Sequence, residues 1–342
     1  MALGVARSSR EACEDLSELE AAITQLVAGQ TIDACSPSLR DALTQLGAEA
    51  IDDGRFRWPA ALVPLDESRI LAALDPLARR RLRTVEVLAS VDSTNRYLLD
   101  RIARAGTHGV QDSVTHPGLV TTECQLAGRG RLGRRWNGSL GASIAVSLAY
   151  QLARSPQQLG GLSLVVGLAV VDALDPHGDL GLKVKWPNDV FYGAGKLCGV
   201  LIELATVPVI DLPVSTVVVG IGVNVAPRPS QRLGLDREVA SIVDSVGPPP
   251  DRNLLLASLA IAVSAFIERF EADGFEPFVQ TFDRLHLLHG RRCTVTGDAT
   301  AADGAAGYVV RVLGAAADGA LRVEADGREH RLVTGDVSLR AT

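Results

Sequence analysis

Apolar residues recur with a helical rhythm in the first part of the chain, up to about residue 66. Apolar positions three and four apart predict two short helices, over 16–27 and 38–46. The segment 54–59 that follows holds a Phe and a Trp, each preceded by an arginine, and it is typical of a short strand or wing. We therefore expect a small first unit over residues 1–66.

The middle of the chain, residues 67–288, mixes helical stretches with apolar runs that are typical of buried strands. Asp92 or Ser93 is a suitable cap for one helix, and Asp251 and Gly274 frame a strongly amphipathic one. The predicted helices cover 67–74, 95–104, 158–174 and 253–272. The predicted strands cover 84–88, 119–124, 142–150, 182–186, 189–192, 197–205 and 216–225, and the basic run 78–83 leads into the first of them.

The pattern changes again at about residue 290. Short strand-like runs at 293–296, 306–312, 321–324, 329–333 and 337–340 alternate with Gly-Asp and Asp-Gly turns. Closely spaced strands joined by tight turns are typical of a small β-barrel. We therefore expect a third unit over residues 289–342.

The composition is that of an ordinary globular chain. Of its 342 residues, 47% are apolar and 22% are charged, which is enough for two or three packed units. The formal net charge is −6, so the chain has no general electrostatic attraction for nucleic acid. Any anion site must therefore be local.

Features of export, membranes and metal sites are weak in this sequence. The first charges are not followed by an apolar stretch, unlike those of a signal peptide, and the longest apolar runs are interrupted as in core helices. The five cysteines lie far apart, with no C-x-x-C or H-E-x-x-H spacing, so we expect neither a disulfide framework nor a metal site made by the protein alone. The sequence favours a cytoplasmic protein that does not contact membranes.

Lysine is rare and confined to one window. Lys183, Lys185 and Lys196 are the three lysines among 34 basic residues, and no arginine lies between them. An ammonium group is a compact point charge, which a planar guanidinium does not replace. The window indicates a site that needs ammonium groups, with a chance grouping on a solvated face as the alternative.

The stretch AGRGRLGRRW, residues 127–136, has the G-x-G-x-x-G spacing from Gly128 to Gly133. In a dinucleotide-binding turn, a helix starts inside the glycines and an acidic residue follows about 20 positions later. Here Arg-Arg-Trp-Asn-Gly follows the glycines, and no Asp or Glu occurs between Glu123 and Asp172. The dinucleotide interpretation is excluded on both counts.

The same loop, with its four arginines, favours another kind of anion site. Glycine lets the backbone approach a ligand closely, and guanidinium forks match phosphate and carboxylate groups. Such a loop can close over a phosphorylated ligand. A solvated basic turn is the alternative, and a nucleic-acid groove is disfavoured because Trp136 is the loop's single aromatic residue.

The lysine window continues into Trp-Pro-Asn-Asp and then into two glycine-containing strands. Lys183 and Lys185 share one face of a strand, and Pro187 sets a turn at its end. The strands 195–203 and 217–225 carry glycines where a ligand can lie close to the sheet. Together these motifs predict a site along one face of a sheet.

Taken together, the motifs resemble those of the biotin–protein ligases, including the bifunctional bacterial ligase/repressors. The matching blocks are 92–95, 125–136, 185–189, 195–203, 220–224 and 337–340. They follow the family's order across residues 84–342. The Gly/Arg loop combined with Lys-Trp-Pro-Asn-Asp separates the chain from the related lipoate ligases, which remain the alternative enzyme.

The resemblance implies an α+β fold: a class II synthetase-like catalytic domain with a mixed β-sheet flanked by helices over 67–288, an SH3-like β-barrel over 289–342, and an α-rich, winged-helix-like segment over 1–66. It also implies the reaction. Biotin and ATP, with Mg²⁺, give biotinyl-5′-AMP and pyrophosphate. The biotinyl group then passes to a lysine of the apo biotin carboxyl carrier protein of acetyl-CoA carboxylase.

Roles for individual residues follow from the same resemblance. The biotin head group is lined by Ser93, Thr94, Asn95 and Gln125, while Arg129, Gly130 and Arg131 hold the carboxylate and the phosphate edge. Lys196 contacts the acyl oxygen and Asp189 orients the carrier lysine, so the catalytic set is Lys196, Arg129, Arg131 and Asp189. The adenylate side comprises Gly128, Arg131, Trp136, Lys183, Asn224 and Arg340, with Mg²⁺ carried by ATP near Asn224.

Two departures from the family pattern qualify these expectations. Leu132 stands where the family often has another arginine, so one phosphate contact is expected to differ. The segment before residue 54 is too short for a full helix-turn-helix and has ten acidic residues against three arginines, whereas a DNA-reading helix is basic. We expect a degenerate winged helix that does not bind DNA. A biotin-responsive repressor is the rival hypothesis, and a homodimer stays open.

Overall fold

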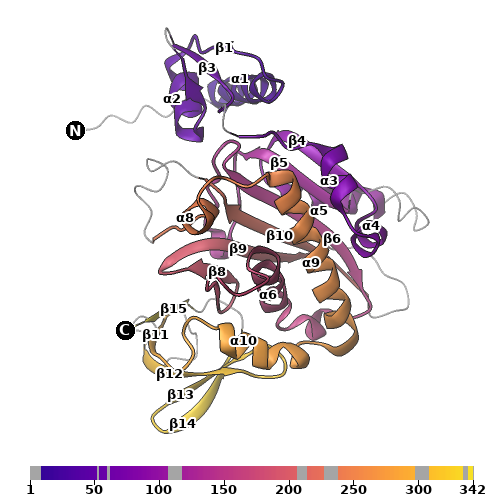
Figure 1. The fold of residues 1–342 in the computed structure, drawn as a ribbon, viewed down its shortest axis with the longest axis vertical. Helices are drawn as coiled ribbons and strands as arrows, with labels where there is room; N and C mark the ends of the chain where they lie inside the picture. Colours follow the sequence, from indigo (N-terminus) through magenta and orange to yellow (C-terminus); the bar gives the residue numbers. More distant parts are fainter. Residues whose placement is uncertain are drawn as a thin grey trace.

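The computed structural model describes residues 9–51, 54–59, 62–106, 118–205, 214–226, 238–296, 308–333 and 338–341. In this part of the chain, a central seven-stranded sheet has a small helical unit at one end and a five-stranded sheet at the other (Figure 1). The chain passes through the three regions in sequence order. The two changes of hydrophobic pattern fall between them.

The central sheet is mixed, as predicted. Its strand order is β4-β5-β6-β10-β9-β8-β7, in which β4 and β5 are parallel and every other neighbouring pair is antiparallel. The strands are β4 (Val85–Val91), β5 (Leu119–Gln125), β6 (Ser143–Leu152), β7 (Lys183–Lys185), β8 (Asp189–Tyr192), β9 (Gly195–Leu204) and β10 (Ser215–Asn224). The apolar strands β6 and β10 lie in the middle of the sheet, where both faces are covered.

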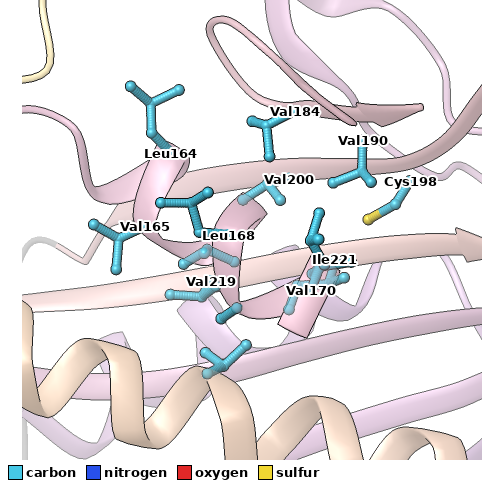
Figure 2. Close-up of a cluster of buried hydrophobic side chains, with 14 of the residues drawn as sticks. Leu164, Val165, Leu168, Val170, Val184, Val190, Cys198, Val200, Val219 and Ile221 are labelled. Carbon is cyan, nitrogen blue, oxygen red and sulfur yellow. The ribbon is translucent and has the colours of Figure 1, made fainter. Parts of the chain in front are cut away.

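Helices cover both faces of this sheet. On one face, α6 and α9 pack against each other and against the strands, and Figure 2 shows Leu164, Val165 and Leu168 of α6 in one cluster with Val200 and Val219 of the sheet. The helices around the sheet are α3 (Glu67–Ala73), α4 (Pro76–Leu82), α5 (Thr94–Gly106), α6 (Leu162–Leu174), α8 (Ile242–Val246), α9 (Arg252–Asp273) and α10 (Val279–Leu285).

The two faces differ because side chains alternate along β10. Val219 and Ile221 point into the main core beneath α6, whereas Val218 belongs to a separate apolar cluster with α5. Gly220 and Gly222 lie on the same face as Val218, and a strand position without a side chain leaves room for another group. The α5 face is therefore the one that can hold a ligand.

The apolar helices α6, with the turn before it, and α9 are long enough to cross a membrane by length and composition. Both instead lie in the main core, as predicted for core helices. The prediction that α9 is strongly amphipathic is wrong. Its exposed side includes Leu254 and Ala265, while Arg252, Asn253 and Ser264 are buried.

Several helix predictions need correction. α6 begins at Leu162 because Gly161 has a φ of +79° and a short 3₁₀ turn, Pro156–Leu159, precedes it. The run before β4 forms α4, which the sequence analysis missed although the Asp75 side chain caps it and a proline opens it. The short helices α8 and α10 were missed as well.

The N-terminal unit has its own small core. It consists of α1 (Ser9–Val27), β1 (Ile32–Asp33), α2 (Pro37–Leu46), β2 (Glu49–Ala50) and β3 (Arg55–Arg57), with strand order β1-β3-β2. Its core extends to Cys124 and Leu140 of the central region, and the Leu140 N–H donates to the Leu46 carbonyl (2.8 Å). The unit is thus seated beside the segment that links the Gly/Arg loop to β6.

The C-terminal region is one antiparallel sheet of order β14-β13-β12-β11-β15. Its strands are β11 (Arg292–Thr296), β12 (Tyr308–Ala315), β13 (Leu321–Ala325), β14 (Arg328–Leu332) and β15 (Ser338–Ala341). The predicted strand starts at 306 and 337 lie outside the described residues. Buried side chains such as Val295, Val312 and Val323 belong to the main core, so this sheet shares its interior with the central region.

Candidate active site

Glycine leaves a bare strip on the α5 face of the central sheet, where β9 and β10 lie side by side. Gly199 and Gly222 are direct partners across these strands. The indole of Trp136 fills the strip: a Cβ on Gly222 would lie 2.4 Å from it, and one on Gly199 3.2 Å. The two glycines are therefore required by a close approach to the sheet, as their strand positions predicted.

The Gly/Arg loop, residues 127–136, folds as a small hairpin directly after β5. The Gly130 N–H donates to the Arg134 carbonyl (2.8 Å), and the Trp136 N–H donates to the Gly128 carbonyl (2.9 Å). Gly128 has no room for a side chain, because a Cβ there would lie 2.3 Å from the Trp136 carbonyl oxygen. At the tip, Leu132 has a φ of +58° and is half exposed, and it does not line the cavity described below.

A buried polar cluster lies where α5 begins. The side-chain oxygen of Gln125 accepts hydrogen bonds from the backbone N–H of Thr94 (3.0 Å) and from its hydroxyl (3.2 Å). Ser147 of β6 donates within the same cluster, 2.8 Å from the Thr94 hydroxyl and 2.5 Å from Asn95 Oδ1. Thr94, Asn95 and Ser147 are buried and Gln125 is half-buried, and these groups hold one another in fixed orientations, which is what recognition of a small polar ring requires.

Glu203, near the end of β9, connects this cluster to the loop. One carboxylate oxygen accepts a hydrogen bond from Asn95 Nδ2 (2.9 Å), and the other lies 3.0 Å from Arg129 Nη2. Asn95 Nδ2 also donates to the Leu201 carbonyl (3.3 Å). Both amide hydrogens of Asn95 are therefore used within the protein, and its oxygen, which accepts from Ser147, has one further lone pair for a ligand.

Lys196 of β9 and Asp189 of β8 form an ion pair at the other side of the strip. Lys196 Nζ lies 2.5 Å from Asp189 Oδ1, and the lysine is only 7% exposed. The ammonium also lies 5.7 Å from the centre of the Trp136 ring, within reach of a cation–π contact. A buried cation, a carboxylate and an aromatic ring from three separate segments thus meet at one point.

Cys198, two residues from Lys196, is not a nucleophile for this site. Burial raises the pKa of its thiol, and the smaller opposing effect of Lys196 does not offset this. The thiol stays protonated at neutral pH and belongs to the main core on the opposite face of β9. The chemistry of the site therefore depends on its cations and on Asp189.

One cavity of about 80 Å³ lies between the loop, α5 and the sheet, although Ser147, Cys198 and Glu203 do not line it. Ten residues predicted from the sequence line it: Ser93, Thr94, Asn95, Gln125, Arg129, Gly130, Arg131, Trp136, Asp189 and Lys196. Asn224 lies next to it, because its Nδ2 donates to the carbonyls of Lys196 and Ala240 (3.2 Å each). Arg134, Arg135, Asn188 and the sheet glycines line it without having been given a role.

Three further predicted residues are not placed at this cavity: Gly128, which lies in the adjoining loop, and Lys183 and Arg340. Lys183 lines a separate, open cavity of about 440 Å³ together with Arg284, His286 and Arg291. Arg340 is in β15, where it pairs with Thr294 of β11, and its side chain is outside the described residues. The structure therefore does not bring Lys183 into the cavity that Lys196 lines.

Residues 87–224, which include every lining residue of the cavity, match the model of the biotin/lipoate A/B protein ligase family. The bifunctional ligase/repressor BirA of Salmonella typhimurium is 33% identical over 289 residues, which cover 84% of this chain and 82% of the relative. The chain belongs to the biotin/lipoate A/B protein ligase family. The expectation drawn from the motifs is confirmed.

Other similarities agree with this assignment to the biotin/lipoate A/B protein ligase family. The biotin–[acetyl-CoA-carboxylase] ligase of Mycobacterium tuberculosis is 36% identical over 191 residues, covering 54% of this chain and 64% of the relative. A biotin protein ligase from Aquifex aeolicus, solved in complex with biotin and ATP, superimposes with a TM-score of 0.60 at 24% identity. The superposition covers 75% of this chain and 99% of that structure. This similarity confirms the fold.

Proposed function

We infer that this chain is a biotin–protein ligase. It joins biotin and ATP to form biotinyl-5′-AMP with release of pyrophosphate, and it then transfers the biotinyl group to one lysine of the biotin carboxyl carrier protein of acetyl-CoA carboxylase. The observation that carries this inference is a single cavity that combines a buried polar pocket, a Gly/Arg loop and the Lys196–Asp189 pair. The bacterial relatives named as biotin ligases support it.

In the first step, a carboxylate oxygen of biotin attacks the α-phosphorus of ATP, and pyrophosphate leaves. Both reactants are anions, so cations are needed to bring them together. We assign this to Arg129 and Arg131 of the loop and to Lys196, which lies buried beside the sheet. Charges fixed before the reaction stabilise the transition state without reorganisation.

In the second step, the amine of the carrier lysine attacks the acyl carbon, AMP leaves and an amide forms. Asp189 is suited to orient the incoming ammonium and to accept its proton, because it already binds the ammonium of Lys196. Lys196 then stabilises the charge that develops on the acyl oxygen. Lys196 thus serves both half-reactions, and Asp189 serves the second.

The adenine is assigned to the strip of Gly199 and Gly222. Trp136 lies in this strip, so an adenine ring placed there requires the indole to move and then to cover the nucleotide. We also assign Gly128, Asn224 and Arg340 to the phosphates of ATP. Lys183 has the least support for this role, because it lines the separate cavity of about 440 Å³.

Mg²⁺ is proposed to arrive with ATP. In the part of the chain that the structure describes, no three His, Cys, Asp or Glu side chains gather as in a protein-only metal site. Mg²⁺ usually keeps waters and binds phosphates plus one or two protein oxygens, and the Asn224 amide beside Lys196 carries an oxygen of that kind. The ion would offset charge on the phosphates.

For the outer regions we propose a reduced winged helix over 1–66, a catalytic domain over 67–288 and an SH3-like domain over 289–342, in a cytoplasmic enzyme. Among its described residues the N-terminal unit has two helices, α1 and α2, which is one fewer than a helix-turn-helix with its wing needs. Together with the acidic charge of residues 1–53, this argues against DNA binding. Because some relatives are named ligase/repressors, biotin-responsive repression is the rival hypothesis. A gel shift with DNA from the promoter regions of the source genome, in the presence of biotin, distinguishes the two hypotheses.

The deciding experiment is a transfer assay. Purified protein, Mg-ATP and biotin are incubated with an apo carboxyl carrier domain, and the mass of the carrier is followed. A gain of one biotinyl group that depends on ATP is expected. No gain with biotin, but a gain with lipoate in its place, would reassign the chain to the lipoate branch of the family.

Lys196→Ala is the sharpest single-residue test. We expect the transfer rate to fall on the order of 10²–10³-fold, the cost of removing one preorganised charge from a transition state. Arg322→Ala, which removes an exposed cation from the C-terminal sheet, is the control and should leave the rate unchanged. A loss below tenfold in Lys196→Ala contradicts the assigned role.

A further inference from the structure

Glu203 touches both the head-group pocket and the Gly/Arg loop, although it does not line the cavity itself. We propose that Glu203 is a positioning residue that couples the two: it fixes the Asn95 amide for the head group and holds Arg129, and with it the loop, against the sheet. This rests on the proposed function for the identity of the ligand. The contacts themselves do not depend on it.

The orientation of Asn95 follows from its partners. The Leu201 carbonyl and the Glu203 carboxylate can only accept hydrogen bonds, so the amide nitrogen must face them. The amide oxygen then faces Ser147 and the space above Gly220, where a Cβ would lie 2.3 Å from it. Without Glu203, one buried amide hydrogen of Asn95 loses its acceptor. The amide group of Asn95 can then rotate, so that its NH₂ group faces the pocket in place of its oxygen.

The hold on the loop follows from the second oxygen. Arg129 belongs to the hairpin, whereas Glu203 belongs to β9, so their contact at 3.0 Å joins a loop to the sheet. The Arg129 side chain is 47% exposed, which makes this a weak ion pair that a ligand anion can replace. The Glu203 side chain thus takes part in two events. It positions Asn95 for the head group, and it releases Arg129 toward the ligand's carboxylate.

Two substitutions separate the two contacts. Glu203→Gln keeps one oxygen, which can still accept from Asn95, but it turns an NH₂ group toward Arg129. Glu203→Leu removes both contacts. Glu86→Gln is the matched control, because Glu86 of β4 also bridges a polar group and an arginine, Tyr97 (2.6 Å) and Arg101 (4.0 Å), on α5 away from the cavity.

The loop is read out by limited proteolysis with thermolysin, which cleaves on the amino side of apolar residues such as the half-exposed Leu132. In the absence of substrates, Glu203→Gln should be cut between residues 131 and 132 about two- to fivefold faster than the parent, as expected for loss of an exposed ion pair. The Glu86→Gln control should be cut at the parent rate. Equal cleavage of Glu203→Gln and the parent overturns the loop contact.

The pocket is read out by calorimetric titration with biotin alone and by steady-state kinetics. Glu203→Leu should raise the Kd and the KM for biotin about 10- to 100-fold, whereas Glu203→Gln should change them less than threefold. The kcat at saturating biotin should change less than the KM in both. A lowered melting temperature with an unchanged Kd for biotin in Glu203→Leu would make the residue merely structural and refute the coupling.

The proteolysis and biotin-binding experiments also distinguish a failure of this inference from a failure of the proposed function. If the parent protein binds no biotin, the ligase assignment fails, and the thermolysin arm still tests the contact between Glu203 and the loop. If the parent transfers biotin but both variants behave like it, the ligase assignment stands and the role of Glu203 is rejected.

Discussion

The regions at the two ends of the chain lie at opposite ends of the central sheet (Figure 1), and they are attached to it in different ways. The C-terminal sheet contributes its buried side chains to the main core, and the Trp186 indole N–H donates to the Gly319 carbonyl (3.3 Å). The N-terminal unit has a separate core that reaches only a few residues of the central region. The first is built into the catalytic fold, whereas the second is a small unit fastened to it.

One buried ion pair contributes to the attachment of the N-terminal unit. Arg252 of α9 lies 2.7 Å from Glu123 of β5, and both side chains are almost fully buried. Arg252 also donates to the Val63 carbonyl (2.9 Å), while Glu123 accepts from the Leu65 N–H (2.5 Å). The pair therefore holds the segment that joins the N-terminal unit to α3.

Breaking this pair should give the largest loss of stability. Arg252→Ala leaves the Glu123 carboxylate buried without its partner, so we expect the free energy of unfolding to fall by about 3–5 kcal/mol. Urea unfolding followed by circular dichroism measures it. Arg69→Ala, which removes a half-exposed partner of Asp251 beside the same segment, is the control and should cost less than about 1 kcal/mol.

Replacing both partners sharpens the interpretation. The double variant Glu123→Leu, Arg252→Met should recover most of the loss, because no uncompensated charge remains in the core. An Arg252→Ala protein as stable as the parent would show that water reaches Glu123 and that the pair does not fasten the unit.

At the other end, Gly319→Ala should be next in size. Gly319 has a φ of +84°, and a Cβ there would lie 2.3 Å from the Gly161 Cα. We expect a loss of about 2–4 kcal/mol from left-handed backbone strain and overpacking, within a single unfolding transition of the central and C-terminal regions. Calorimetry measures both quantities.

Gly327→Ala provides the matched control in the same sheet. Gly327 has a φ of +72° but open space around its Cα, so the backbone cost of about 1–2 kcal/mol should be all that is lost. Separate melting of the C-terminal sheet in Gly319→Ala would break the comparison, because it would make both ends independent units.

The smallest expected effect is a dependence on pH at the C-terminal junction. The backbone N–H of Trp186 donates to His286 Nε2 (3.3 Å), and burial lowers the pKa of His286 to about 3. The His286 imidazole binds a proton near pH 6.5 in the unfolded chain but only near pH 3 in the folded chain. The free energy of unfolding therefore falls as the pH drops from 6.5 toward 3, by about 2 kcal/mol at pH 5.

His286→Gln tests this dependence, since a glutamine oxygen can accept from the same N–H without titrating. The difference in unfolding free energy between pH 7 and pH 5 should shrink by about 2 kcal/mol relative to the parent. An unchanged difference would mean that other groups account for the acid sensitivity of this junction.

The sequence predicted the residues of the cavity better than it predicted how they hold one another. Glycines and arginines in one short loop, and lysine beside Trp-Pro-Asn-Asp, carry their chemistry in their identity and spacing, and the structure brings most of them together. Ser147 and Glu203 carry no such signal. Their partners lie 52 to 108 positions away in the sequence, and only the register of β6, β9 and β10 brings them to α5.

The same limit applies to the fold. Apolar runs located every central strand, because burial on both faces of a strand sets that pattern. It could not distinguish the arginine-rich α4 from a lead-in to β4, and it did not anticipate that Gly160 and Gly161 separate a short turn from α6. It also could not show that Lys183, on the edge strand β7, lines a cavity with Arg284 and His286 and not with Lys196, since those residues lie about a hundred positions away in the sequence.

The scarcity of lysine has a consequence for an enzyme of the proposed kind. An acyl-adenylate reacts with any accessible primary amine, including those of the protein that makes it. Here Lys196 is buried against Asp189, and the ammonium of Lys185 lies over the Phe191 ring (5.3 Å). With arginine in almost every other basic position, a ligase of this composition has little amine of its own to acylate, so its intermediate is reserved for the carrier or lost to water.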